Sequence, residues 1–490
     1  MNQTVQPTPV DQAGNPPPDP RRWRILTVLL TALVMSLVGV SIVNVALPAI
    51  QDGLHASQSD IQWVLSGYAL TFGVVLVSAG RTGDILGRGG LFLVGVAIFT
   101  VSSIAAGLAP DAGWLNMARF VQGLGSGILS PQGIGMIQQY FRGAERGRAF
   151  GYLGTAVGFA VAVGPVLGGI LIQLGGEGLG WRLTFLINVP VGIATIALGM
   201  KWFPRPLISS LQQRNGAARR PTSLLRSLDP IGSVLLGLAV LAILFPFMES
   251  SSAPILWLLL PAGLALAYLW VKWERHYARR GGSPMVDLNI FSIPSFANGT
   301  LIMTLYFLGM TSVWVLIALY VQLGTGGSAF EAGLFSIPAA LFSAYAADWA
   351  GRRVMRYGRR IVIGGLLLAL LGLGLSILVA WLYEKGLASV WWLVLTLSFI
   401  GIAQGLVISP NQALTLADVP LAYAGSSGAV MQTGQRMGTS IGIAMITAAT
   451  FATHTATSSW TFAVMAGFGV VALVMLATLL VAIKDMRGRG

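Results

Sequence analysis

The chain has 490 residues, of which 55% are hydrophobic and 10% charged, and its formal net charge is +13 at pH 7. The positive charge lies in short connections between long apolar stretches, which argues for membrane topology and against a nucleic-acid partner. The sequence contains no cysteine, which excludes a disulfide framework and a thiolate metal site.

Fourteen apolar stretches are each long enough to cross a bilayer as a helix, which needs about 20 predominantly apolar residues. In chain order, we expect spans at 25–48, 59–80, 91–109, 113–140, 149–174, 183–203, 230–249, 255–273, 297–321, 331–350, 361–382, 388–410, 424–452 and 460–483. The pattern predicts a polytopic protein embedded in a lipid bilayer.

Lysine and arginine alternate between the two sides of the predicted membrane. The first tail, the even-numbered connections and the last tail hold 26 of the 30 Lys and Arg residues. Short positive loops tend to stay in the cytoplasm during insertion, so both termini are predicted to be cytoplasmic. Spans rich in Gly, Ala, Leu and Val, together with the lack of cysteine, favour the bacterial cytoplasmic (inner) membrane.

Two charge-rich connections divide the spans into groups of six, two and six. The first segment carries six prolines and no long apolar run, which is typical of a disordered tail rather than of a signal peptide. We expect a disordered cytoplasmic tail at 1–23, an N-terminal six-helix bundle at 24–203, a cytoplasmic loop at 204–228, two additional transmembrane helices at 229–275, a cytoplasmic linker at 276–296, a C-terminal six-helix bundle at 297–484 and a cytoplasmic tail at 485–490.

The two groups of six spans share an internal repeat. The segment 80–88 begins and ends with Gly-Arg, and the segment 351–359 repeats that pattern at the same spacing. Each segment follows the second span of its group. Transporters are commonly built from such repeats, with a substrate site near the midplane and alternating access by movement of one half against the other.

The glycines of 80–88 let two helix ends approach closely, and Asp84 can accept hydrogen bonds from cationic groups or from a helix N-terminus. This segment, which ends at Arg88, resembles the signature loop of the major facilitator superfamily. The resemblance implies an all-α polytopic fold of two six-helix bundles, here with two extra central helices. We assign Asp84 and Arg88 a role in coupling or gating.

Motifs within the spans narrow the resemblance. Arg119 belongs to a fourth-span pattern at 118–125, and further runs lie at 42–48 and 181–190. The fifth span carries a candidate antiporter motif of Gly164, Pro165, Gly168 and Gly169. Together these motifs are similar to the fourteen-span drug/proton antiporter branch. Membership implies export of small amphipathic molecules, including antibiotics, by alternating access and driven by proton entry. We expect a monomer that needs no cofactor or metal.

The proton carrier is not evident from the spans. The first span has Gly39 where this branch usually places an acidic residue, and none of the 17 acidic residues lies near the middle of a span. Asp348, Glu331 and Asp84 are therefore the candidate carriers. Asp348 is the first candidate because it interrupts an apolar helix, although it can also be a solvated helix end beside Arg352.

Two embedded arginines are the strongest candidates for a polar cavity. Because an arginine at a span centre costs about 2.5 to 3.5 kcal/mol on insertion scales, Arg119 and Arg436 should face protein or a wet cavity. Each guanidinium either donates hydrogen bonds to carbonyl and amide groups of the protein or contacts substrate. The expected cavity prefers neutral or anionic amphiphiles, and its other candidate residues are Asn44, Gln62, Gln122, Asn298, Trp314 and Gln432.

Other classes of protein are less compatible with the sequence. A dedicated lipid or metabolite exporter is the nearest alternative, and a non-transporting sensor would need a signalling domain that the tails and loops do not supply. The pattern at 438–442 matches the Gly-x-Ser-x-Gly elbow of hydrolases, but it lies inside an apolar span with no preceding strand. The three histidines are widely separated. We therefore expect no enzyme activity, and an ion gradient as the energy source because no Walker loop is present.

Overall fold

The computed structural model describes residues 19–207, 228–248, 254–282 and 284–488. Most of the predicted tail at 1–23 and of the predicted loop at 204–228 lies outside these residues. Within them the secondary structure is helical, without β-strands. The α-helices are α1 (Arg22–Leu54), α2 (Gln58–Leu86), α3 (Arg88–Gly107), α4 (Ala112–Tyr140), α5 (Gly143–Leu186), α6 (Asn188–Trp202), α9 (Pro230–Met248), α10 (Leu259–Arg279), α11 (Pro294–Leu319), α12 (Ala329–Leu334), α13 (Ser336–Tyr357), α14 (Arg359–Glu384), α15 (Trp392–Thr415), α16 (Ala424–Thr457) and α17 (Trp460–Arg487). Short helical turns are η2 (Pro254–Leu258), η3 (Leu288–Ser292), η4 (Tyr320–Gly324) and η5 (Leu421–Tyr423).

Helices end where the local sequence stops them. Gly87 and Gly358 have φ values of 114° and 53°, which residues with a Cβ rarely adopt, and each separates two helices at the equivalent point of the internal repeat. Gly176, with φ 63°, divides α5, so that the chain continues from one helical segment, Gly143–Gly176, into the next, Gly178–Trp202. Ser57 begins α2 with a capping box shared with Asp60.

Eleven helical segments of the described residues are long and apolar enough to span a membrane. In hydrocarbon a helix satisfies its own backbone hydrogen bonds, which explains why these apolar segments are helical. The predicted spans at 113–140, 331–350 and 424–452 correspond to α4, α13 and α16, which are long helices but do not meet the same hydropathy and charge criterion. Eleven of the fourteen predicted spans thus have the length and hydropathy of a membrane helix, and the other three are richer in polar residues.

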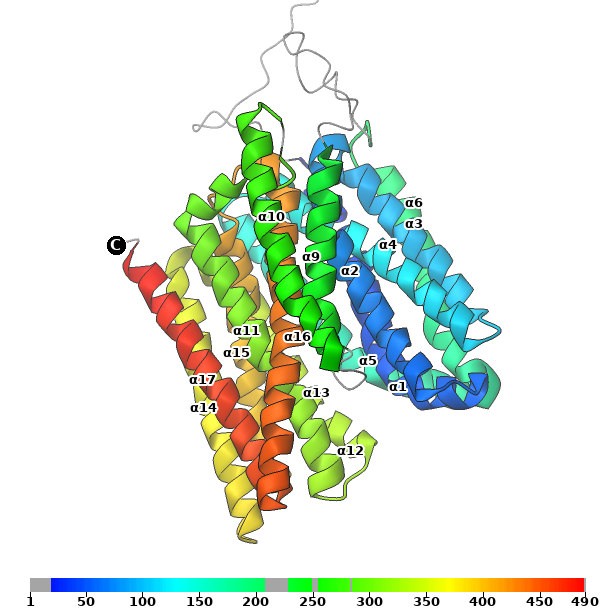
Figure 1. Ribbon diagram of the computed structural model, residues 1–490, viewed down its shortest axis with the longest axis vertical. Helices are drawn as coiled ribbons and strands as arrows, with labels where there is room; N and C mark the ends of the chain where they lie inside the picture. Colours follow the sequence, from blue (N-terminus) through cyan, green and yellow to red (C-terminus); the bar gives the residue numbers. More distant parts are fainter. Residues whose placement is uncertain (1–18, 208–227, 249–253, 283, 489–490) are drawn as a thin grey trace, which may run out of the picture.

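The helices form two bundles that meet along one interface (Figure 1). Helices α1 to α6 make up the first bundle and α11 to α17 the second. The main contacts between the bundles join α5 to α13 and α2 to α16. Helices α9 and α10 pack on each other at the front of the view, and α9 also contacts α2 and α16, one helix from each bundle.

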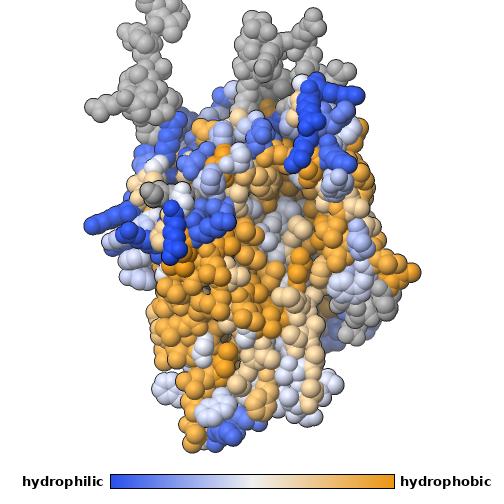
Figure 2. Space-filling view, turned by 60° about the vertical axis from the view of Figure 1, so that its left-hand side comes forward, coloured by the Kyte–Doolittle hydropathy of each residue, from blue (hydrophilic) through white to orange (hydrophobic). Residues whose placement is uncertain are grey.

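One end of the molecule carries the start of α1 and the end of α17, and we call it the terminal face (the upper end in Figure 1). The bundles separate from each other toward the opposite end of that view. Figure 2 shows hydrophilic residues gathered mainly at the upper end, with hydrophobic residues covering the side below. This distribution is the one expected for helices that cross a bilayer.

Candidate functional site

Asp84 connects the two bundles near the terminal face. Its carboxylate accepts hydrogen bonds from the backbone N–H groups of Gly425 and Ser426, at 2.8 and 2.9 Å, in the first turn of α16. It also accepts two bonds from the Arg88 guanidinium, at 3.0 and 2.6 Å. A helix N-terminus carries partial positive charge, so a carboxylate placed there is stabilised. Asp84 therefore holds α2 of the first bundle against α16 of the second.

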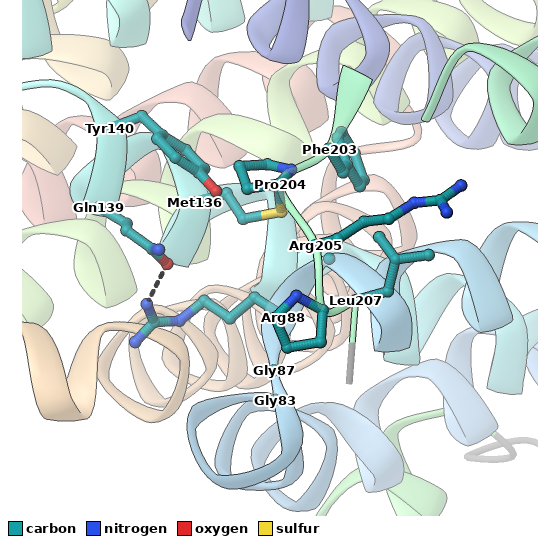
Figure 3. Close-up of a pocket in the computed structure, with 12 residues that line it drawn as sticks. Gly83, Gly87, Arg88, Met136, Gln139, Tyr140, Phe203, Pro204, Arg205 and Leu207 are labelled. Atoms are coloured by element: carbon teal, nitrogen blue, oxygen red, sulfur yellow. Dashed lines mark hydrogen bonds between the residues drawn. The ribbon is translucent and has the colours of Figure 1, made fainter. Parts of the chain in front are cut away.

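Arg88 extends this network to two further segments. Its guanidinium donates to the carbonyl of Leu421 and to the side chain of Gln139, each at 2.7 Å. Figure 3 shows Arg88 pointing toward Gln139 across a polar pocket that the ends of α2 and α4 form with the segment 203–207. We refer to Asp84, Arg88 and their partners on η5 and α16 as the terminal gate.

Glycines allow the bundles to touch beside the terminal gate. A Cβ added to Gly80 would lie 2.6 Å from the carbonyl oxygen of Gly425, and one added to Gly351 would lie 2.5 Å from the Cα of Gly151. Both distances are too short for a real side chain, so only glycine permits this approach. Farther along α5, the Thr155 hydroxyl donates to the carbonyl of Ala344 at 2.9 Å. The bundles are therefore closed against each other on the terminal side.

The second copy of the repeat makes a different network. Arg359, the counterpart of Arg88, binds Asp485 near the end of α17 and Asn411 on α15, all within the second bundle. Asn298 donates to Asp485 at 2.9 Å. Asn298, which the sequence predicts to line the substrate cavity, lies in the first turns of α11 at the terminal face.

The other two candidate proton carriers lie on α13 and α12. Asp348 pairs with Arg352, with an Nη2 to Oδ2 distance of 2.8 Å, and its side chain is 28% exposed. Glu331 caps the short helix α12, where its Oε2 accepts from the Ser328 N–H at 2.7 Å. Neither carboxylate forms an ion pair with an embedded arginine.

The position of Gly39 is packed rather than open. A Cβ added there would lie 3.3 Å from the ring of Phe99 and 3.6 Å from the side-chain nitrogen of Asn188. The ring of Phe99 would have to shift by a few tenths of an ångström to admit a Cβ at this position.

Arg119 is buried and satisfied inside the first bundle. Its Nε donates to the carbonyl of Val64 at 2.8 Å and its Nη1 donates to Gln122 at 2.6 Å. Gln122 in turn donates to Ser103, at 2.7 Å, and the guanidinium lies 4.4 Å from the centre of the Tyr68 ring. Arg119 and Gln122 are 1% and 0% exposed, so these contacts support the structural interpretation for both.

Arg436 has a different environment, at the interface between the bundles. Its guanidinium lies 4.3 Å from the centre of the Phe72 ring on α2, a cation–π contact between the two halves. It is only partly buried and makes no hydrogen bond or ion pair with another described residue. Tyr68 lies one turn before Phe72 on the same face of α2, and the centres of the two rings are 6.2 Å apart.

Two glutamine side chains near Arg436 also carry amide N–H groups that have no hydrogen-bond acceptor. Gln432, one turn earlier on α16, accepts from the Ser130 hydroxyl at 2.8 Å, while its Nε2 has no partner. The Nε2 of Gln435 has no partner either. Amide and guanidinium donors therefore gather beside an aromatic pair, and we call Phe72, Tyr68, Gln432, Gln435 and Arg436 the donor cluster. Phe72 and Ser130 were not among the predicted cavity residues. The four-residue spacing from Tyr68 to Phe72 could have indicated that these two lie on one face of a helix.

The remaining predicted residues occupy several places. Asn44 on α1 and Gln62 on α2 are exposed, and Trp314 on α11 is half-buried against the core of the second bundle. The fifth-span motif packs on α1, because a Cβ added to Gly164 would contact Ser41 and one added to Gly168 would contact Ile42. A Cβ added to Gly169 would have no neighbour within 4 Å. Pro165 lies within α5.

Residues 29–443 match the family model described as Major Facilitator Superfamily. The chain belongs to the major facilitator superfamily. Its all-α architecture agrees with that of solved members: the human organic anion transporter MFSD10 superposes with a TM-score of 0.68 at 14% identity, covering 95% of this chain and 100% of that one. The fold predicted from the sequence is confirmed.

Two curated members of the superfamily resemble the chain over most of its length. A protein of Streptomyces coelicolor named a probable actinorhodin transporter is 33% identical over 445 residues, which are 90% of this chain and 74% of the relative. The tetracenomycin C resistance and export protein of Streptomyces glaucescens is 30% identical over 433 residues, 87% of this chain and 75% of the relative. The family and these relatives are membrane transporters rather than enzymes.

Proposed function

We propose that the protein is a secondary active exporter of small amphipathic molecules, and that it belongs to the fourteen-span drug/proton antiporter branch. It acts as a monomer in the bacterial cytoplasmic membrane with both termini in the cytoplasm. The names of the relatives support this proposal, since one refers to transport of actinorhodin and the other to resistance to and export of tetracenomycin C. In this topology the terminal face is cytoplasmic, and α4, α13 and α16 complete the fourteen spans.

The donor cluster is the observation that carries the proposal. It places three groups that can only donate at their unpartnered atoms beside the buried rings of Tyr68 and Phe72. A ligand that places an acceptor or a negative charge between them would satisfy these donors. The geometry therefore favours neutral acceptor-rich or anionic aromatic amphiphiles over cations, because a cation would be repelled by Arg436.

The closed terminal gate supports the proposed alternating access. The bundles touch through Gly80 and Gly425 on the terminal side, so in the proposed topology the structure represents an outward-facing state. Opening toward the cytoplasm requires Asp84 to release the backbone N–H groups of α16. The same movement would separate Arg436 from Phe72, because these residues lie on opposite sides of the interface.

Coupling to proton entry is proposed from the resemblance, and Asp348, Glu331 and Asp84 remain its candidate carriers. Asp84 is bound in the terminal gate, Asp348 pairs with Arg352 on α13, and Glu331 caps α12. A proton taken up at these sites would act on those contacts rather than compete directly with substrate at Arg436.

Accumulation in efflux-deficient bacteria tests the proposed function. The probes are 8-anilinonaphthalene-1-sulfonate, its uncharged parent N-phenyl-1-naphthylamine, and the cation ethidium. We expect cells that express the chain to exclude the first two more strongly than ethidium, and Arg436→Gln to reduce exclusion of the sulfonate most. Loss of exclusion in Asp348→Asn would identify that residue as part of coupling. Exclusion of none of the three would contradict the proposal and favour a dedicated lipid or metabolite exporter.

A further inference from the structure

Two buried carboxyl groups that belong neither to the terminal gate nor to the donor cluster lie at the ends of the two additional helices. Asp229 directly precedes α9 and Glu274 lies near the end of α10, so both are close to the terminal face (Figure 1). Each residue is 1% exposed. Burial of a carboxylate is costly unless hydrogen bonds or an opposite charge compensate it, so the partners of these two groups decide their state.

The protein satisfies one oxygen of each carboxyl group. Asp229 Oδ1 accepts from the backbone N–H of Gly232 at 3.0 Å and from the indole N–H of Trp273 at 2.9 Å. Glu274 Oε2 accepts from the backbone N–H of Met285 at 3.0 Å. The other two oxygens, Asp229 Oδ2 and Glu274 Oε1, are buried and have no hydrogen-bond partner.

These two unpartnered oxygens face the same small space beside Gly232. A Cβ added to Gly232 would lie 2.3 Å from Asp229 Oδ2 and 3.0 Å from Glu274 Oε1. Oxygens of ionised carboxylates only accept hydrogen bonds, so neither can satisfy the other. A proton on one of them would turn it into a donor and would satisfy both. We call Asp229 and Glu274 the acid pair.

No cation neutralises the acid pair within the part of the chain that the structure describes, because none of the four ion pairs there includes either residue. Helix α9 and the turn η2, which contact α10, carry no titratable side chain. Of the helices that contact α9, α2 carries Arg81 and Asp84 toward its terminal end, and α16 carries Arg436. The other titratable groups near Glu274 in the chain are the exposed Lys272, Arg275 and His276, Tyr277, whose ring stacks on Trp273, and Asp287, which caps η3.

We propose that Asp229 and Glu274 form a proton-binding site, in which Glu274 carries the proton and donates a hydrogen bond from Oε1 to Asp229 Oδ2. Two buried like charges that face each other without a cation cannot both be ionised, so the pair retains one proton. Asp229 is the acceptor, because it lies at the N-terminus of α9, where the helix dipole and the N–H of Gly232 stabilise negative charge. Release of the proton leaves two carboxylates that repel each other.

The acid pair also holds the segment that leads into the second bundle. Besides its bond to Glu274, Met285 accepts at its sulfur from Ser233 on α9 at 3.1 Å and from Ser78 on α2 at 3.7 Å. Ser78 lies two residues before Gly80, beside the terminal gate. Segment 284–287 therefore joins α10 to α9 and to α2.

Helix α9 contacts both α2 and α16, one helix from each bundle, so these contacts favour the closed arrangement of the terminal gate. Loss of the proton should loosen segment 284–287 and disfavour that arrangement. A lower pH at the terminal face then keeps the gate closed, and a higher pH promotes its opening. The inference goes beyond the proposed function, and only the assignment of the terminal face to the cytoplasm rests on it.

Infrared spectroscopy of the purified full chain tests for the proton, because the carbonyl stretch of a protonated carboxyl group is separate from the bands of carboxylates and amides. We expect such a band in the unmodified chain at neutral pH, its loss as the pH is raised, and its absence from Glu274→Gln. Asp229→Asn should shift the loss of the band to lower pH, since Glu274 then faces no negative charge. Glu384→Gln removes an exposed carboxyl group at the end of α14 and should leave the band unchanged.

Hydrogen–deuterium exchange tests the effect on segment 284–287 and on the first turn of α16. Glutamine at position 274 resembles the protonated glutamate, because its carbonyl can accept from Met285 and its amide can donate to Asp229, whereas Glu274→Ala removes both contacts. At alkaline pH, both segments should exchange several-fold faster in the unmodified chain than in Glu274→Gln. At mildly acidic pH these two proteins should exchange equally, and Glu274→Ala should exchange fast at both pH values.

Several results would overturn the proposal. An infrared spectrum without a protonated carboxyl band at neutral pH, or a band that Glu274→Gln retains, would show that the pair holds no proton. Slowing of exchange by sodium or potassium ions rather than by protons would identify a metal-cation site instead. Equal exchange in the unmodified chain and Glu274→Gln at alkaline pH would exclude the effect on the gate. None of these measurements uses a transported compound, so failure of the proposed function in the accumulation assay is a separate outcome.

Discussion

Replacing Asp84 with asparagine should shift the protein toward the state that is open at the terminal face. The substitution conserves shape but removes the charge and one acceptor oxygen. The contact with Arg88 lies within the first bundle and is available in both states, so it does not decide the shift. The state-dependent contacts are the hydrogen bonds from Gly425 and Ser426. Weakening these two charge-assisted bonds at a helix N-terminus should disfavour the closed gate by about 2 kcal/mol, which is roughly a 30-fold change in the ratio of states.

The absence of cysteine provides a clean assay for this shift, because one introduced thiol is then the single reactive site. Ser409→Cys places a thiol of similar shape at a position that is 1% exposed and faces Gly154 across the interface. Its labelling by a membrane-impermeant maleimide should be slow in the unmodified background and much faster with Asp84→Asn. Glu384→Gln, at the exposed end of α14, controls for the loss of a surface carboxylate. Equal labelling rates with and without Asp84→Asn would refute the gating role.

Three further predictions concern packing and stability. Gly80→Ala should also accelerate labelling of Ser409→Cys, because its methyl group would meet the Gly425 carbonyl, whereas Gly364→Ala, in open space, should not. Arg119→Gln should lower the free energy of unfolding by about 2 to 3 kcal/mol, because its buried partners lose a charged donor. Thermal unfolding in detergent measures this loss, and an unchanged unfolding midpoint would contradict the prediction. Asp348→Asn should change that free energy by at most about 1 kcal/mol, because the ion pair between Asp348 and Arg352 is partly exposed to solvent. A large loss of stability would contradict this and would indicate that the carboxylate is buried.

Part of the candidate site could be predicted from residue type and position in the repeat. Asp84 was expected to accept from a cation or a helix N-terminus, and the structure shows both kinds of partner, Arg88 and the first turn of α16. Glycines at the two repeat segments were expected to permit close approach, and Gly80 and Gly351 do so. These features were accessible because backbone geometry and charge restrict which residue types can occupy such positions.

The amino-acid sequence by itself determined the helical, membrane-embedded class of this protein and the positions of eleven spans, since apolar length is a property of contiguous residues. The tertiary structure decided which polar groups remain available. Arg119 and Arg436 look alike along the chain, but α2 supplies a carbonyl acceptor to the first and, among the described residues, an aromatic ring without an acceptor to the second. The environment of Asn298 likewise depends on another helix, because its partner, Asp485, lies 187 residues away. A buried polar group is satisfied or left available by side chains from other helices, and the spacing of residues along one helix does not contain that information.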